Sequence, residues 1–157
     1  MKETLLTVLE NTRLADGIYR LRLAGDTSAI TAPGQFVNLK LSGFFLRRPI
    51  SVCDWENGEV TLIYKVLGHG TEAMTGMAVG TALDVLTGLG NGFDLSRSGE
   101  HPLLVGGGVG IPPLYGLARR LTAQGKRVTA VLGFNRKSEI FLAEEFRALG
   151  AEVVIAT

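Results

Sequence analysis

The stretch Leu103-Leu104-Val105-Gly106-Gly107-Gly108-Val109-Gly110-Ile111-Pro112-Pro113 decides the fold of this chain. Three apolar residues lead into four glycines within five positions, and two prolines follow. This order predicts a buried strand, a glycine turn and a helix start, because proline suits the first helical turn. Glycines let a backbone approach an anion closely, and the free amides at a helix start can bind it. The stretch therefore predicts a phosphate-binding turn.

The glycine turn departs from the dinucleotide-binding fingerprint. Pro113 stands where the third glycine would be, and no Asp or Glu ends the next expected strand, which runs into Gly133-Phe134-Asn135. The alternative is a tight turn without a ligand, but four glycines exceed what a turn needs, so we expect Gly106–Gly110 to receive a nucleotide. An acid would bind a ribose hydroxyl, whereas Arg136 or Lys137 could meet a 2′-phosphate, so NAD and NADP both stay open.

The residues before this stretch alternate between apolar and polar, as short antiparallel strands do. Asp16-Gly17 and Asn57-Gly58 are hairpin signals, and Thr71 suits the N-cap of a short helix that runs to about Met77. We expect six strands, at residues 4–14, 19–23, 35–41, 49–53, 59–66 and 81–86. Six short strands with turns between them predict a small closed or nearly closed barrel.

The residues after it alternate between helix and strand. A helix is expected over 111–124 and a second one is capped by Ser138, with strands over 101–105, 127–132 and 151–155. This order predicts the start of a parallel sheet. The fold class is therefore an antiparallel β-barrel over residues 1–98, followed by an α/β nucleotide-binding domain over 99–157.

Composition excludes several classes of protein. The net charge of +1 gives no electrostatic footprint for nucleic acid. No apolar run has the length of a membrane span and no signal-peptide pattern opens the chain, so we expect a cytoplasmic protein. Cys53 is the one cysteine, which excludes an intrachain disulfide and a CxxC metal or cluster site.

Three further segments have a functional and a structural interpretation. Arg47-Arg48-Pro49-Ile50-Ser51 could present a guanidinium to a diphosphate and a hydroxyl to a heterocycle, or it is a solvated arginine pair at a strand edge. Gly68-His69-Gly70-Thr71 is a second glycine turn at a helix start, where His69 by itself is more typical of an exposed loop. Gly88–Asp94 is an interdomain loop, with a place in a cleft as the alternative.

These motifs occur in the order seen in the ferredoxin–NADP reductase superfamily, which the chain resembles over nearly its whole length. The matching residues are Pro33-Gly34-Gln35-Phe36, Arg48-Pro49-Ile50-Ser51, Gly70-Thr71, Gly90-Asn91-Gly92-Phe93 and Gly106 to Pro113. Most members carry an aromatic residue at the position of Ile50. An aliphatic residue there resembles the subfamily of dihydroorotate dehydrogenase B electron-transfer subunits.

The resemblance implies a site for FAD and one for NAD(H). Arg48 would neutralise the FAD diphosphate, and Gly70 and Thr71 would hold that diphosphate at the helix start. Pro49, Ile50 and Ser51 would lie along the flavin, with Ile50 against the ring and Ser51 near its N5. Ile63, Tyr64 and Lys65 would line the cofactor with backbone and side chain. Gly106, Gly107, Gly108, Val109 and Gly110 would receive the nicotinamide nucleotide.

The resemblance also implies partners and a reaction. A catalytic subunit with FMN would oxidise dihydroorotate in pyrimidine biosynthesis, as half of a heterotetramer, and electrons would pass through a [2Fe-2S] cluster and FAD to NAD⁺. The family places the cluster on a C-terminal cysteine-rich segment, which this sequence lacks. We therefore expect the sequence to be a fragment, with the cluster only in a longer native chain. The alternatives are a stand-alone NAD(P)H:flavin or ferredoxin reductase, and a fragment that binds FAD without turnover.

Overall fold

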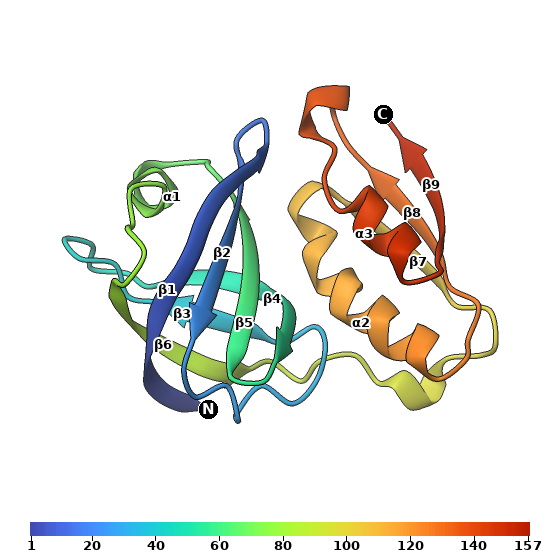
Figure 1. Ribbon diagram of the computed structural model, residues 1–157, viewed down its shortest axis with the longest axis horizontal. Coiled ribbons are helices and arrows are strands. Elements are labelled where there is room, and N and C mark those ends of the chain that lie inside the picture. Colours follow the sequence, from blue (N-terminus) through green and yellow to red (C-terminus); the bar gives the residue numbers. More distant parts are fainter.

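A closed six-stranded antiparallel barrel forms the first half of the chain (Figure 1). The computed structural model describes all residues from Met1 to Thr157. The strands are β1 (Lys2–Ala15), β2 (Ile18–Ala24), β3 (Phe36–Leu39), β4 (Arg48–Glu56), β5 (Glu59–Lys65) and β6 (Ala82–Leu89), in the order β1-β2-β5-β4-β3-β6. Asn57 and Gly58 join β4 to β5 with φ values of 51° and 77°, as a two-residue hairpin requires. The predicted barrel is confirmed.

One short helix, α1 (His69–Met74), lies beside one end of the barrel. Its Met74 side chain is fully buried in the barrel core. The prediction that Thr71 is the N-cap is wrong, because Gly68 holds that position and Thr71 lies in the first turn. The helix also ends before Met77, whose amide donates to Met74 O in a further turn.

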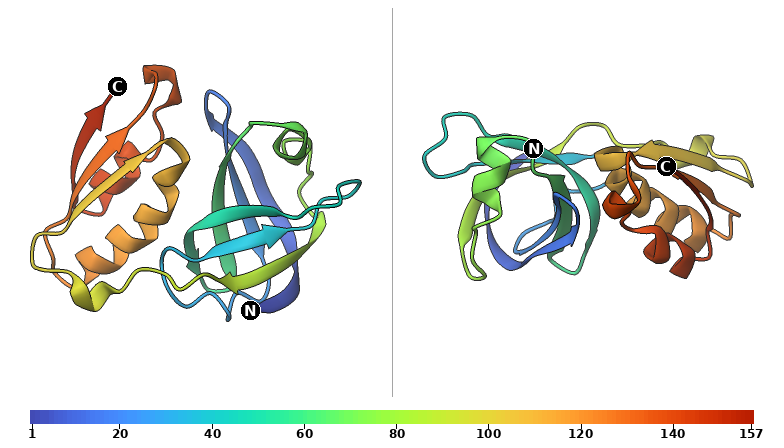
Figure 2. Two further views of the ribbon diagram at one scale, coloured as in Figure 1. Left: turned by 180° about the vertical axis from the view of Figure 1, so that it is seen from behind. Right: turned by 90° about the horizontal axis from the view of Figure 1, so that it is seen from above.

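The second half is a three-stranded parallel sheet in the order β7-β8-β9, with its helices on one face (Figure 2). Its elements are β7 (Leu103–Gly107), α2 (Pro112–Ala123), β8 (Thr129–Gly133), α3 (Ala143–Ala148) and β9 (Glu152–Ala156), with single 3₁₀ turns η1 (Leu95–Arg97), η2 (Gly108–Gly110) and η3 (Lys137–Glu139). The predicted parallel sheet is confirmed. None of the helices is long and apolar enough to cross a membrane.

The second helix of this half begins later than expected. Ser138 lies in η3 and does not cap α3, which starts after Leu142 in a left-handed conformation with φ 64°. The Ser138 carbonyl instead accepts a hydrogen bond from the Asp16 amide at 3.1 Å, so η3 is held against the β1–β2 hairpin of the barrel.

Two apolar clusters form the core, and the larger one joins the two halves. Fifteen buried residues fill the barrel. The other cluster has 18 buried residues, and it combines Ile18, Cys53 and Ile63 of the barrel with α2, α3 and one face of the sheet. Because α2 packs directly on β4, the two halves share a continuous interior.

The segment that connects the halves is tied to the barrel by Gln35, whose side chain is 6% exposed. Its Oε1 accepts hydrogen bonds from the amides of Thr31 and Ala32, and its Nε2 donates to the Gly90 carbonyl at 3.0 Å. The Phe93 amide donates to Pro33 O at 2.7 Å. The Pro33–Phe36 and Gly90–Phe93 motifs are therefore two sides of one interlocked loop pair.

Candidate functional site

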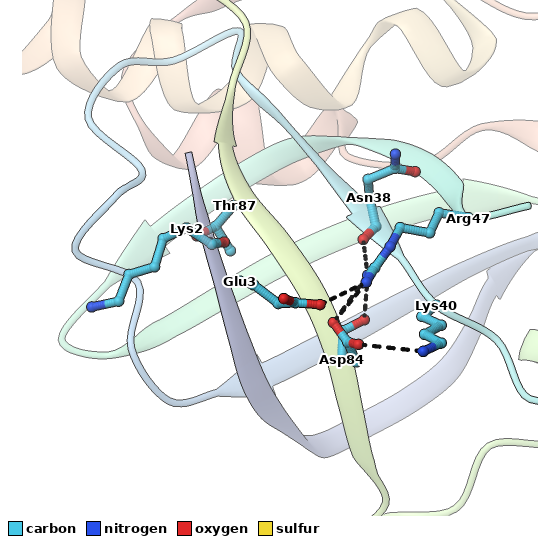
Figure 3. A network of polar contacts seen from close by, with 7 residues as sticks. All are labelled: Lys2, Glu3, Asn38, Lys40, Arg47, Asp84 and Thr87. Atoms are coloured by element: carbon cyan, nitrogen blue, oxygen red, sulfur yellow. Dashed lines mark hydrogen bonds and ion pairs between the residues drawn. The ribbon is translucent and has the colours of Figure 1, made fainter.

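The two adjacent arginines, Arg47 just before β4 and Arg48 at its first residue, have different surroundings. Arg47 turns toward β6 and β1, where both of its terminal nitrogens donate to Asp84 Oδ1 at 3.0 Å and Nη2 donates to Glu3 at 2.9 Å (Figure 3). Lys40 lies 3.8 Å from the same Asp84 carboxylate. Arg47 is thus a structural ion-pair partner, and not half of a solvated pair.

Arg48 packs on α1 instead. A Cβ atom added to Gly70 would lie 2.1 Å from Arg48 Nε, so the guanidinium occupies the space that only glycine leaves free. Arg48 Nη1 donates to Leu46 O at 2.6 Å, and its Cζ lies 5.0 Å from the centroid of the Phe44 ring. Arg48 makes no ion pair within the chain. Its charge is therefore available to an anion beside Gly70.

The hydroxyl of Thr71 is used within its own turn. Its Oγ1 accepts from the amides of Leu67 and Gly68 at 2.9 and 3.2 Å. The amides of His69, Gly70 and Thr71 belong to the first helical turn and have no intrahelical acceptor. At this turn the free hydrogen-bond donors next to the Arg48 guanidinium are therefore backbone amides and not the Thr71 hydroxyl.

The residues that follow Arg48 line one edge of β4. Pro49 is exposed, Ile50 and Ser51 are half-buried, and Ile50 packs partly against the barrel core. The sequence interpretation missed Asn38, which pairs with Pro49 across the β3–β4 ladder. Its Oδ1 is buried and has no hydrogen-bond partner in the chain. A buried acceptor without a donor is rare in a folded protein and suits a ligand that donates a hydrogen bond.

The three predicted residues of β5 face different directions. Tyr64 is 1% exposed and its hydroxyl donates to Asn11 Oδ1 at 2.9 Å, inside the barrel. Burial raises the pKa of Tyr64 to about 12. Ile63 packs in the cluster shared with α2. Lys65 lines the cavity beside the glycine turn, whereas Ile63 and Tyr64 are only 3% and 1% exposed.

The glycine turn opens on a cavity of about 580 Å³ at the carboxyl ends of the parallel strands. Open α/β sheets bind ligands at this edge. Gly107, Gly108 and Val109 line one side, and Lys65 reaches in from the barrel, 3.6 Å from Glu139 Oε1. Gly106 has a packing role, since a Cβ there would lie 2.7 Å from Leu114 Cδ1.

The charged residues around this cavity differ from the sequence expectation. Arg136 and Lys137 are exposed and do not line it, whereas Glu139 does. Glu139 lies six residues beyond the end of β8, outside the position where the fingerprint places an acid. Only the η3 turn, which folds the chain back over the cavity, brings this carboxylate to Lys65, and no sequence signal marks that turn.

The chain is similar to named proteins over its full length. It is 46% identical to the dihydroorotate dehydrogenase B (NAD⁺) electron transfer subunit of Bacillus pumilus, covering 100% of this chain and 64% of that protein. The protein of the same name from Shouchella clausii is 44% identical, over 99% of this chain and 63% of the relative. This chain thus spans just under two thirds of the length of these relatives. No protein-family model matches it.

Solved structures with the same fold include a ferredoxin–NADP oxidoreductase and an FAD/NAD-binding domain of another enzyme. An NADH-dependent reduced ferredoxin–NADP oxidoreductase superposes with a TM-score of 0.86 at 29% identity, over 97% of this chain and 56% of that one. The FAD/NAD-binding domain of a nitric oxide dioxygenase from Vibrio cholerae gives 0.80 at 23% identity, over 96% and 72%; at that identity it shows the fold alone. The chain is therefore a homologue of the dihydroorotate dehydrogenase B electron transfer subunits, with the fold of the ferredoxin–NADP reductase superfamily.

Proposed function

We propose that this chain binds FAD and NAD(H) as the electron-transfer subunit of a dihydroorotate dehydrogenase. The barrel, residues 1–98, holds FAD, and residues 99–157 form part of the domain that receives the nicotinamide nucleotide. An FMN-containing catalytic subunit oxidises dihydroorotate in pyrimidine biosynthesis, in a cytoplasmic heterotetramer, and electrons leave through this chain to NAD⁺. FAD supplies the exchange between one-electron and two-electron transfer.

The observation that carries the proposal is the presence of two sites suited to anions, one beside Gly70 and one at the glycine turn. Arg48, without a carboxylate partner, lies on Gly70 beside three free amides, which suits a diphosphate. At the second site, Gly107 and Gly108 line a cavity together with Lys65, the last residue of β5. A cofactor held along β4 and a nucleotide in this cavity would meet between the barrel and the sheet.

Each residue of the proposed FAD site contributes through the part that the structure leaves free. Arg48 and the first-turn amides of Gly70 and Thr71 neutralise and orient the diphosphate. The Ser51 hydroxyl, the Asn38 amide oxygen and the backbone of Pro49 and Ile50 face the ring system. The backbone of Ile63, Tyr64 and Lys65 forms the neighbouring wall.

In the nucleotide site, Gly106 shapes the turn by its packing, and Gly107, Gly108, Val109 and Gly110 present backbone amides. Lys65 lines the same cavity, where its ammonium group is paired with Glu139. A [2Fe-2S] cluster does not fit the residues of this chain, since no group of three or more His, Cys, Asp and Glu side chains is placed to hold a metal and Cys53 is buried.

Spectroscopy of the purified protein tests the proposal. Added FAD should bind and remain through gel filtration, and anaerobic NADH should bleach the flavin band. A colourless protein that does not retain FAD contradicts the proposal. The second candidate function is a stand-alone NAD(P)H:flavin or ferredoxin reductase, which the reductase fold of a structural neighbour favours. Co-purification with an FMN-containing subunit that oxidises dihydroorotate would distinguish the proposed function from this candidate.

A further inference from the structure

Helix α2 approaches strand β4 more closely than a side chain allows. A Cβ atom added to Gly116 would lie 2.8 Å from the carbonyl oxygen of Cys53. Cys53 stands at a β-bulge, because the register of β4 with β5 shifts between Val52 and Asp54. A bulge bends a strand and turns the extra residue out of the ladder. Here that residue meets the bare backbone of the helix.

Two arginines of α2 bind residues of β4 next to this contact. Arg119 donates to Trp55 O at 3.2 Å and lies 3.1 Å from both the Asp54 and the Glu56 carboxylates. Arg120 lies over the indole of Trp55, with Cζ 3.6 Å from a ring centroid, and donates to Gly116 O at 3.1 Å. We call Cys53, Asp54, Trp55, Gly116, Arg119 and Arg120 the β4–α2 joint.

The joint lies between the two proposed binding segments. Ser51 precedes Cys53 by two residues along β4, and Gly110 precedes Gly116 by six residues at the start of α2. An extended strand rises about 3.3 Å and a helix about 1.5 Å per residue, so both segments lie within roughly 10 Å of the joint along rigid elements. A shift of α2 against β4 therefore moves the glycine turn against the flavin segment.

We propose that the β4–α2 joint sets the distance between flavin and nicotinamide, with Gly116 as the positioning residue. The inference rests on the proposed function. Glycine inside a helix is less favourable than alanine, so its presence in the middle of α2 needs a structural cause, and the approach to Cys53 O is that cause. Hydride transfer between two bound rings is sensitive to displacements of about 1 Å.

The test is Gly116→Ala in the protein at its full natural length. Alanine favours the helix, so the fold is retained, but its methyl group forces α2 away from β4. We expect flavin reduction at saturating NADH to slow at least tenfold and the flavin–nicotinamide charge-transfer absorption to weaken, with FAD and NADH affinities within twofold of the unaltered protein. Gly99→Ala is the matched control, since Gly99 lies in the linker with no atom within 4 Å of an added Cβ.

A ligand-free measurement reports the joint itself. Trp55 is the one tryptophan among these 157 residues, so acrylamide quenching of the 157-residue chain without FAD follows the contact of Trp55 with Arg120. Gly116→Ala should increase the quenching of Trp55. Arg120→Lys keeps the charge but loses the contact of the planar guanidinium with the indole, so it should increase the quenching and also slow flavin reduction. Reduction at the unaltered rate in both variants overturns the inference and leaves the proposed function intact. Failure of the unaltered protein to bind FAD or to be reduced by NADH overturns the proposed function first.

Discussion

Two neighbouring arginines, Arg47 before β4 and Arg48 at its start, have separate tasks. Arg48 is free of carboxylates and lies on Gly70, so Arg48→Ala should raise the Kd for FAD at least about tenfold, because a charge-assisted hydrogen bond contributes about 1.5–3 kcal/mol. Arg47→Ala is the control. It should lower the denaturation midpoint by leaving Asp84 with only the more distant Lys40 as a charge partner, while FAD affinity stays unchanged. Flavin fluorescence titration measures the Kd for FAD in each variant. Equal FAD affinities in the two variants would contradict the assignment.

Tyr64 makes the free energy of unfolding of the barrel decrease at alkaline pH. Its folded pKa of about 12 lies above the unfolded value of about 10, so the stabilisation is complete below pH 10 and is lost as the pH rises toward 12. Burial is the main cause, and the hydrogen bond to Asn11 opposes it in part. The loss is at most about 3 kcal/mol.

Urea denaturation between pH 8 and pH 11.5 measures this loss. Tyr64→Phe should cost about 1 kcal/mol at pH 8, from the hydrogen bond to Asn11, and should show a flatter decline at higher pH. Parallel pH curves for the two proteins would show that another group carries the dependence.

Among the elements, the interlocked loops at Gln35 combine two motifs that are far apart in the sequence. Gln35→Ala leaves the Thr31 and Ala32 amides without an acceptor, which should cost about 1–3 kcal/mol of unfolding free energy. The exposed Gln124 offers the matched Gln→Ala control. Limited proteolysis should also cut Gly90–Phe93 faster in the Gln35→Ala variant. Unchanged cleavage and an unchanged urea midpoint would refute the role of Gln35 in holding the two loops together.

The glycine turn gives a second prediction at this scale. Gly108 has φ +51° and no atom within 4 Å of an added Cβ, so Gly108→Val should retain the fold but narrow the cavity. NADH affinity should fall at least about tenfold, for the loss of one to two backbone contacts, while FAD binding persists. Gly125→Val controls for backbone strain, because Gly125 has φ +80°, equal space and no contact with the cavity. Loss of FAD in the Gly108 variant would mean that the two sites are exchanged.

Local patterns were sufficient to predict the elements, but not the contacts between them. Alternation and hairpin signals predicted the six barrel strands, and helical spacing predicted α2 to within a residue or two. The caps failed at Thr71 and Ser138, because a hydroxyl near a helix start can serve several turns and tertiary contacts choose among them. Glu139, Asn38 and the β4–α2 joint depend on which elements meet, and local spacing carries no information on that.

At the scale of the whole molecule, one face of the parallel sheet is bare. The helices cover the opposite face, and β7 is an edge strand whose Leu103 and Val105 side chains are 62% and 67% exposed (Figure 2). Val154 of β9 is also exposed, at 46%. An unpaired edge next to exposed apolar side chains invites pairing with another chain.

We therefore expect the 157-residue chain to associate with itself as its concentration rises. Val105→Lys should shift sedimentation toward the monomer, because a lysine on an edge strand opposes strand pairing. Val79→Lys provides the control, since Val79 is 70% exposed but lies outside the sheet, before β6. Both variants add the same charge, so only the site differs. A chain that sediments as a monomer at every concentration, or two variants that dissociate equally, would show that the bare face does not drive association.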